Sequence, residues 1–80
     1  MSHTCYQHLK LVETIYQWGG AYSYESLTIQ RCRECGQLWK LRAQWDAGTG
    51  NDSILIRPGE SQRGYTFTVE EAAKYEAVQP

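Results

Sequence analysis

The sequence predicts a small α+β fold, an antiparallel β-sheet of hairpins followed by one C-terminal helix. Two observations lead to this prediction. Short segments rich in β-branched, aromatic and alternating apolar residues are separated by glycine-containing turns, and one stretch near the end of the chain begins with a helix cap. The 80 residues contain no linker or repeat, so residues 1–80 are expected to form a single domain. Because so small a core is marginally stable, we expect a metal, disulfides or a second subunit to add stability.

The first hairpin is expected from residues 9–18 and 21–31, LKLVETIYQW and AYSYESLTIQR. Both segments are rich in β-branched and aromatic residues, which is typical of strands. Gly19 and Gly20 stand between them, and this dipeptide suits a tight turn with positive φ. The whole hairpin with its flanking motifs covers about residues 5–36.

A sheet extension is expected over residues 37–67. Residues 38–45 alternate with a period of two, residues 53–57 read SILIR, and residues 65–67 read YTF, with polar turns between them. For the strand at 38–45 we expect an inward face of Trp39, Leu41, Ala43 and Trp45, and a solvent face of Lys40, Arg42 and Gln44.

The C-terminal helix is expected from Val69 to about Val78, residues 69–78. Thr68 precedes it, and Glu71 follows three residues later, which is the spacing of a capping box. In that arrangement the Thr68 hydroxyl accepts from the Glu71 N–H, and the Glu71 carboxylate reaches back to the Thr68 N–H.

Two short motifs carry the cysteines. Residues 5–8, CYQH, have the spacing C-x2-H, and residues 32–36, CRECG, have the spacing C-x2-C followed by Gly36. Zinc takes four thiolate or imidazole ligands in a tetrahedron, and each motif can supply two neighbouring ligands from one turn. Gly36 fits a turn that needs positive φ.

The lengths of the two arms place these motifs together. His8 lies eleven residues before Gly19, and Cys32 lies twelve residues after Gly20, so a hairpin folded at the glycines brings both motifs to one end. The interpretation is one structural Zn²⁺ per chain, and its ligands are Cys5, His8, Cys32 and Cys35.

Three alternatives remain open at this point. Cys32 and Cys35 could form a redox C-x2-C pair, although that motif belongs at the start of a helix, and residues 37–45 have the pattern of a strand. The cysteines could also be buried without a ligand. Within the zinc interpretation, His3 could replace His8 as the fourth donor.

On the motifs C-Y-Q-H and C-R-E-C-G, the chain resembles the zinc-ribbon and zinc-knuckle superfamily. The resemblance covers roughly the first forty residues and extends to no particular family within that group. It implies a bound metal with its local geometry. Members of this broad group bind DNA, RNA or proteins, so the resemblance does not choose a partner.

Charge and cysteine content limit the possible partners and the cellular compartment of the protein. Eight Lys and Arg stand against nine Asp and Glu, so the chain lacks the basic excess typical of nucleic-acid binding. An odd count of three cysteines, with neither a signal sequence nor an apolar span, predicts a soluble protein in a reducing intracellular setting, the cytoplasm. A local basic patch is nevertheless expected near the second motif, formed by Arg31, Arg33, Lys40 and Arg42.

These features predict a binding protein that is not an enzyme. Four zinc ligands close the coordination shell, and the sequence shows no phosphate loop, H-E-x-x-H motif or catalytic triad pattern. The ten aromatic residues include three around the glycine turn, and these could form an exposed contact surface or pack beneath later strands: Trp18, Tyr22 and Tyr24.

The predicted function is therefore protein binding by a small regulatory protein, as accessory subunit, adaptor or inhibitor of a larger complex. The alternative is nucleic-acid binding through the basic patch. No membrane association is expected, and the sequence leaves the oligomeric state open.

Overall fold

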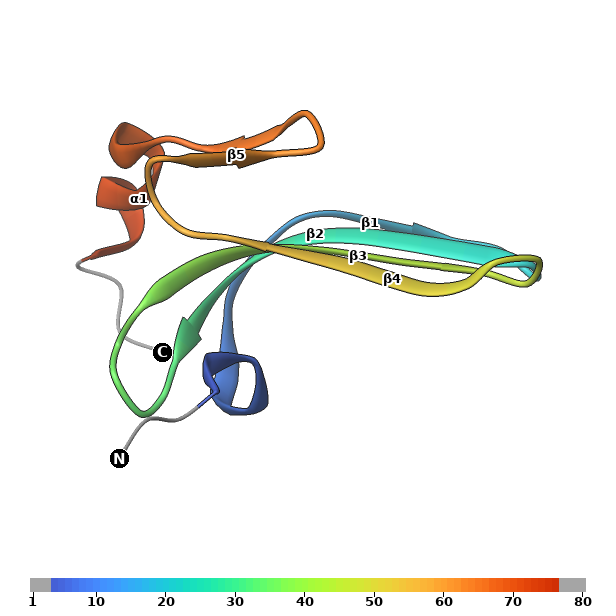
Figure 1. The fold of residues 1–80 in the computed structure, drawn as a ribbon, viewed down its shortest axis with the longest axis horizontal. Coiled ribbons are helices and arrows are strands. Elements are labelled where there is room, and N and C mark those ends of the chain that lie inside the picture. Colours follow the sequence, from blue (N-terminus) through green and yellow to red (C-terminus); the bar gives the residue numbers. More distant parts are fainter. Residues whose placement is uncertain (1–3, 77–80) are drawn as a thin grey trace.

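A computed structural model describes residues 4–76, which form a four-stranded antiparallel sheet, a separate hairpin and one helix (Figure 1). The predicted combination of an antiparallel sheet with a C-terminal helix is confirmed. The predicted helix residues 77 and 78 lie outside the described range. Within that range no helix has the length and apolar character needed to cross a membrane. In chain order the elements are η1 (Cys5–His8), β1 (Leu9–Gly19), β2 (Ser23–Cys32), β3 (Leu38–Asp46), β4 (Gly50–Ile56), β5 (Glu60–Gln62), β6 (Tyr65–Phe67) and α1 (Val69–Glu76).

The first hairpin pairs β1 with β2 but turns differently from the prediction. Gly19 belongs to β1 and is paired with Tyr24, and the Gly20 N–H donates to the Ser23 carbonyl at 2.8 Å. The predicted positive φ at Gly19 and Gly20 is wrong, because the left-handed glycines of this chain lie at other turns. The longer loop at residues 20–22 reverses the chain without that conformation.

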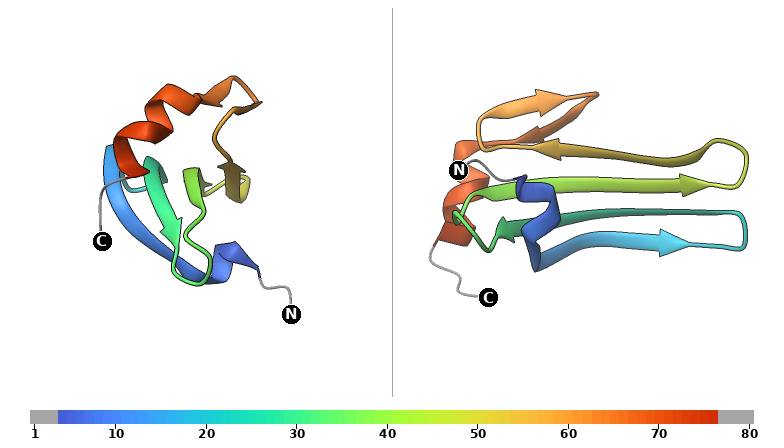
Figure 2. Two further views of the ribbon diagram at one scale, coloured as in Figure 1. Left: turned by 90° about the vertical axis from the view of Figure 1, so that its left-hand side faces the viewer. Right: turned by 60° about the horizontal axis from the view of Figure 1, so that its bottom comes forward.

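The core lies on one face of the sheet, beneath α1 and the β5–β6 hairpin (Figures 1 and 2). The predicted inward face of β3 is wrong, because Lys40 is only 6% exposed on the core side while Trp45, on the other side, is 36% exposed. Apolar residues later in the sequence cover this side of the sheet, and they determine which face of β3 is buried. The buried cluster is Ile29, Leu38, Ile54, Ile56, Phe67 and Ala72.

In the β5–β6 hairpin, the predicted strand at residues 65–67 is confirmed as β6, whereas β5 forms where a polar turn was predicted. Its two strands are joined by Arg63 and Gly64, whose φ values are +53° and +84°. Positive φ at both central residues is the requirement of a type I′ hairpin turn. For Arg63 this conformation is unfavourable, and its guanidinium is held by an ion pair with Asp52 of β4 at 2.8 Å.

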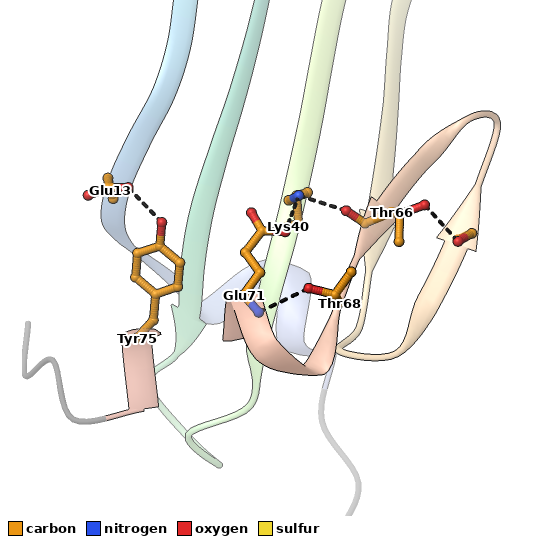
Figure 3. A network of polar contacts seen from close by, with 7 residues as sticks. Glu13, Lys40, Thr66, Thr68, Glu71 and Tyr75 are labelled. Carbon is orange, nitrogen blue, oxygen red and sulfur yellow. Dashed lines mark hydrogen bonds and ion pairs between the residues drawn. The ribbon is translucent and has the colours of Figure 1, made fainter. Parts of the chain in front are cut away.

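A polar network joins the helix to the sheet (Figure 3). The Lys40 Nζ donates to Glu71 Oε1 at 2.8 Å and to the Thr66 carbonyl at 2.7 Å. At the far end of the helix, the Tyr75 hydroxyl donates to Glu13 Oε2 at 2.6 Å, and this hydrogen bond raises the pKa of Tyr75 to about 12. Residues of α1 are therefore tied to both β3 and β1.

The predicted capping box forms only in part. The Thr68 hydroxyl accepts from the Glu71 N–H at 3.0 Å, as expected. The Glu71 carboxylate contacts Lys40 rather than reaching back to the Thr68 N–H. A partly buried ammonium group is a stronger partner for a carboxylate than a backbone N–H at a helix end.

Replacing Thr68 by alanine is expected to lower the free energy of unfolding by about 1 kcal/mol, because one N–H at the helix start loses its acceptor. Urea denaturation measures the change. Thr68→Ser keeps the hydroxyl and is the control, expected to stay close to the parent protein. Equal stability of the alanine and serine variants would show that the cap contributes nothing.

Candidate metal centre

Three cysteine sulfurs converge at one end of the sheet. Cys5 comes from η1, Cys32 ends β2, and Cys35 lies in the turn that leads to β3. The three Sγ atoms all lie within 4.8 Å of one another, and Cys5 Sγ is 3.6 Å from Cys35 Sγ. Zinc–sulfur bonds of about 2.3 Å in a tetrahedron place sulfurs about 3.8 Å apart. The predicted convergence is confirmed for the cysteines, which form a group able to hold a metal ion.

The turn after Cys32 has the backbone expected of a knuckle. Gly36 has a φ of +80°, as predicted, and its N–H donates to the Cys32 carbonyl at 2.8 Å. The Arg33 N–H donates to the His8 carbonyl at 2.9 Å. This last hydrogen bond joins the two motifs directly, so the first motif is positioned by the second.

The environment of the Cys5 thiol opposes its ionisation in the absence of a cation. Cys32 is 1% exposed, Cys5 is half-buried and Cys35 is exposed. Desolvation, together with contacts from Cys32 and Cys35, raises the pKa of Cys5 to about 11. Three neighbouring thiolates repel one another, and a bound cation removes that repulsion. A metal ion would therefore replace thiol protons in this cluster.

The indole of Trp39 provides a second indication of a thiolate centre. Its Nε1 is buried and has no hydrogen-bond partner among the described residues. The indole nevertheless acts on the Cys5 thiol and lowers the pKa of that group, against the stronger effects that raise it. A buried N–H without an acceptor is costly, and a metal-bound Cys5 thiolate would give this N–H an acceptor.

His8 stands beside the cysteine group without belonging to it. Its Nδ1 is 3.7 Å from Glu34 Oε1, and its side chain is 31% exposed. The group whose donor atoms all lie within 4.8 Å of one another contains the three cysteines and does not include His8. His3, the alternative donor, lies outside the described residues.

The four residues of the predicted basic patch do not form one surface. Arg31 and Arg33 line a cavity of about 300 Å³ next to Cys32, together with Lys10, which the sequence did not suggest. Lys40 is instead buried and forms an ion pair with the half-buried Glu71. Arg42 lies 3.5 Å from Glu25 and 3.6 Å from Asp52. Lys40 and Arg42 therefore form ion pairs on the side of the sheet that α1 and the β5–β6 hairpin cover, and they do not contribute to a basic surface patch.

The aromatic residues of the first hairpin lie at the end of the sheet away from the cysteines. The exposed fractions of Trp18, Tyr22 and Tyr24 are 51%, 77% and 37%. Trp45 joins them, since it pairs directly with Tyr24 across β2 and β3. Trp45 was not predicted as a surface residue, because the face of β3 that carries it was expected to lie in the core. We call these four residues the aromatic tip.

Comparison of the chain with protein-family models, curated proteins and solved structures finds no match. Its fold and its cysteine group define it as a small antiparallel β-sheet protein with a candidate metal centre.

Proposed function

We propose that the chain is a non-catalytic, zinc-ribbon-like protein, stapled by one structural zinc ion and acting through contact with another protein. The convergence of the three sulfurs is the observation that supports the metal most strongly. Thiolate ligands favour zinc over hard cations such as magnesium and calcium. A reducing, cytoplasmic setting would keep the thiols available for the ion.

His8 is the proposed fourth ligand. Since Nδ1 of His8 faces the Glu34 carboxylate, Nε2 is the ring nitrogen that we propose binds the metal. A carboxylate that accepts from the second nitrogen of a ligating histidine is a common arrangement around zinc, because it orients the ring and raises its basicity. Three cysteines and one histidine would close the shell, which favours a structural role over a catalytic one.

The aromatic tip is the proposed site for a protein partner. Large aromatic side chains that remain exposed on a small domain are the commonest anchors of protein interfaces. Trp18 and Tyr22 are at least half exposed and lie far from the cysteines, so the metal and the contact surface occupy opposite ends of the sheet. Such a protein suits the role of accessory subunit, adaptor or inhibitor.

Replacing Trp18 or Tyr22 by alanine is expected to weaken partner binding by about 2 kcal/mol or more, the loss typical of an aromatic hot spot. Thermal stability should change little, because both side chains are exposed. The partner is captured from the native host on the immobilised parent protein, and its affinity for each variant is measured by calorimetry. Tyr6→Ala, at the metal end, is the control. Unchanged affinity, or a large loss of stability, would contradict this role of the tip.

Nucleic-acid binding is the second candidate, and the cavity beside Cys32 favours it. Lys10, Arg31 and Arg33 gather there, although Lys40 and Arg42 do not join them. Phosphate contacts make affinity fall steeply with salt, whereas an aromatic protein interface responds weakly. The salt dependence of binding to a single-stranded oligonucleotide therefore separates the two candidates.

A further inference from the structure

The three cysteines of the metal centre differ in how easily a dissolved molecule reaches their sulfurs. Cys35 is exposed, Cys5 is half-buried, and Cys32 is only 1% exposed. Oxidants in water attack the thiols that they can reach, so Cys35 is the first sulfur that they meet. Whether an oxidised thiol ends as a disulfide then depends on a second sulfur standing close to it.

Cys5 supplies a second sulfur close to Cys35. The two Sγ atoms are 3.6 Å apart, although the residues are separated by 30 positions in the sequence. They come from η1 and from the turn between β2 and β3, which lie side by side at one end of the sheet (Figure 2). Because a disulfide bond is about 2.05 Å long, the two sulfurs need to approach each other by about 1.5 Å.

Both of these sulfurs stand on backbone that can make so small a movement. η1 is a single short helical turn, Cys5–His8, in which no residue is buried and no side chain caps the start. Cys35 lies in the exposed turn that follows β2. Segments with few buried contacts are the ones that shift at little cost in free energy.

Cys32 is held more firmly than either of them. It ends β2, where it is paired with Leu9 of β1. Its N–H donates to the Gln37 carbonyl at 2.9 Å, and its carbonyl accepts from the Gly36 N–H at 2.8 Å. A buried sulfur on backbone fixed in this way neither meets the oxidant first nor moves readily toward Cys35.

The spacing of the sequence alone would favour another pair, Cys32 with Cys35. Only two residues separate them, and in an unfolded chain the ends of so short a loop meet more often than residues 30 positions apart. Redox C-x2-C pairs, however, stand at the start of a helix, whereas here the turn leads into β3. The fold therefore reverses the preference that loop length sets.

We propose that hydrogen peroxide joins Cys5 to Cys35 in a reversible disulfide and leaves Cys32 as a thiol. This bond then holds η1 to the turn before β3 in place of the metal. The inference goes beyond the proposed zinc centre, because it depends on the convergence of the thiols and not on the ion. Disulfides of proteins in reducing compartments are typically transient and redox-sensing, and a bond to the exposed Cys35 is open to reduction.

The reaction takes two steps. The Cys35 thiolate attacks one oxygen of the peroxide, the O–O bond breaks, and the hydroxide that leaves takes up a proton; the sulfur is oxidised to a sulfenic acid and the peroxide is reduced. The Cys5 sulfur then attacks the Cys35 sulfur, the S–O bond breaks, and the second hydroxide takes up the proton of the Cys5 thiol, or one from solvent if that thiol was already ionised. Two thiols and one hydrogen peroxide thus give one disulfide and two water molecules. The disulfide removes two of the proposed ligands, so bound zinc leaves.

Peptide mapping of the purified chain after treatment with hydrogen peroxide tests the pairing. The remaining thiols are alkylated in denaturant, and trypsin then cleaves after the basic residues, so each cysteine lies on its own peptide. We expect a cross-link between residues 1–10 and 34–40, a mass lower by about 2 Da before alkylation, and alkylation at Cys32 alone. Bound zinc, measured before and after the treatment, should fall from about one ion per chain to none.

The same chain unfolded in urea with a chelator is the matched control, because its pairing follows loop length alone and should give mostly Cys32 linked to Cys35. A folded chain in which that pair dominates overturns the proposal, as does one that is oxidised without an intramolecular cross-link. The zinc content before treatment distinguishes the two proposals. A folded chain that holds no zinc and still joins Cys5 to Cys35 contradicts the zinc centre and supports the pairing.

Thermal unfolding tests whether the disulfide holds η1 in place of the metal. With a chelator present, the oxidised chain should keep a cooperative transition, because a cross-link between distant residues restricts the unfolded chain. Adding a phosphine reductant should abolish that transition. An oxidised chain that melts as the reduced, metal-free chain does would show that the cross-link does not replace the metal, and it would overturn this part of the proposal.

Discussion

Replacing Cys32 by serine is expected to abolish metal binding and cooperative unfolding together. Structural zinc contributes on the order of 10 kcal/mol to folding in small domains, which is comparable with the whole stability of an ordinary domain. Among residues 4–76 the buried apolar cluster has six members, a core too small to stabilise the sheet strongly by itself. Elemental analysis measures the metal, and circular dichroism measures the thermal transition.

Cys35→Ser separates the loss of metal from the loss of packing. Cys35 is exposed, so an isosteric change there should cost little unless its sulfur binds a metal. We expect it to behave like Cys32→Ser. Because protons compete with the metal for the remaining ligands, His8→Ala should retain zinc less well and lose it at a higher pH than the parent protein. A Cys35→Ser variant with unchanged melting and unchanged metal content would contradict the proposed ligand set.

Replacing Lys40 by alanine is expected to lower the free energy of unfolding by about 3 kcal/mol. The change leaves the Glu71 carboxylate and the Thr66 carbonyl without their donor, and breaking a buried ion pair from one side is strongly destabilising. The ammonium group also lies 5.4 Å from the centre of the Phe67 ring, so a cation–π contact is lost as well. Urea denaturation of the reconstituted protein measures the effect.

Two further variants identify the cause of that loss. Lys40→Met keeps the aliphatic stem over Phe67 and should recover part of the stability. Combining Lys40→Ala with Glu71→Gln should cost less than the sum of the single changes, because the carboxylate is then no longer left without its partner. Lys74→Ala, on the exposed side of α1, should change stability by less than about 0.5 kcal/mol. Strict additivity would show that the ion pair contributes nothing.

The first hairpin and the meeting of the cysteines could be predicted because both depend on local spacing. The register pairs Leu9 with Cys32, so the two cysteine motifs, which flank β1 and β2, meet at the same end of the hairpin. This result does not depend on where the turn lies. The error at Gly19 and Gly20 therefore did not disturb the expected convergence. Gly36 was equally predictable, since a C-x2-C turn asks for positive φ at one position.

The faces of β3 could not be predicted from its own residues. Alternation identifies a strand but does not say which side another layer will cover. Here Phe67 and Ala72, far along the chain, cover the side that carries Lys40, and Glu71 supplies the carboxylate that makes burial of a lysine tolerable. Trp45 was therefore placed on the wrong side, and its position next to Tyr24 in the aromatic tip was missed.

The β5–β6 hairpin illustrates a different limit. Its strands, Glu60–Gln62 and Tyr65–Phe67, have three residues each, too few for a periodic pattern. The composition of residues 65–67 predicts the second strand, and the glycine of the Arg63-Gly64 turn is the only further sequence indication of the hairpin. The ion pair between Arg63 and Asp52 becomes visible only in the folded chain. The cap at Thr68 was found because it depends on neighbouring residues alone.

X-ray absorption at the zinc edge, combined with elemental analysis of the purified protein, tests the proposed metal centre most directly. We expect one zinc per chain, with three sulfur ligands at about 2.3 Å and one nitrogen ligand at about 2.0–2.1 Å. Spectra without sulfur ligands would contradict the centre, as would a protein that takes up no zinc under reducing conditions and still unfolds cooperatively in the presence of a chelator.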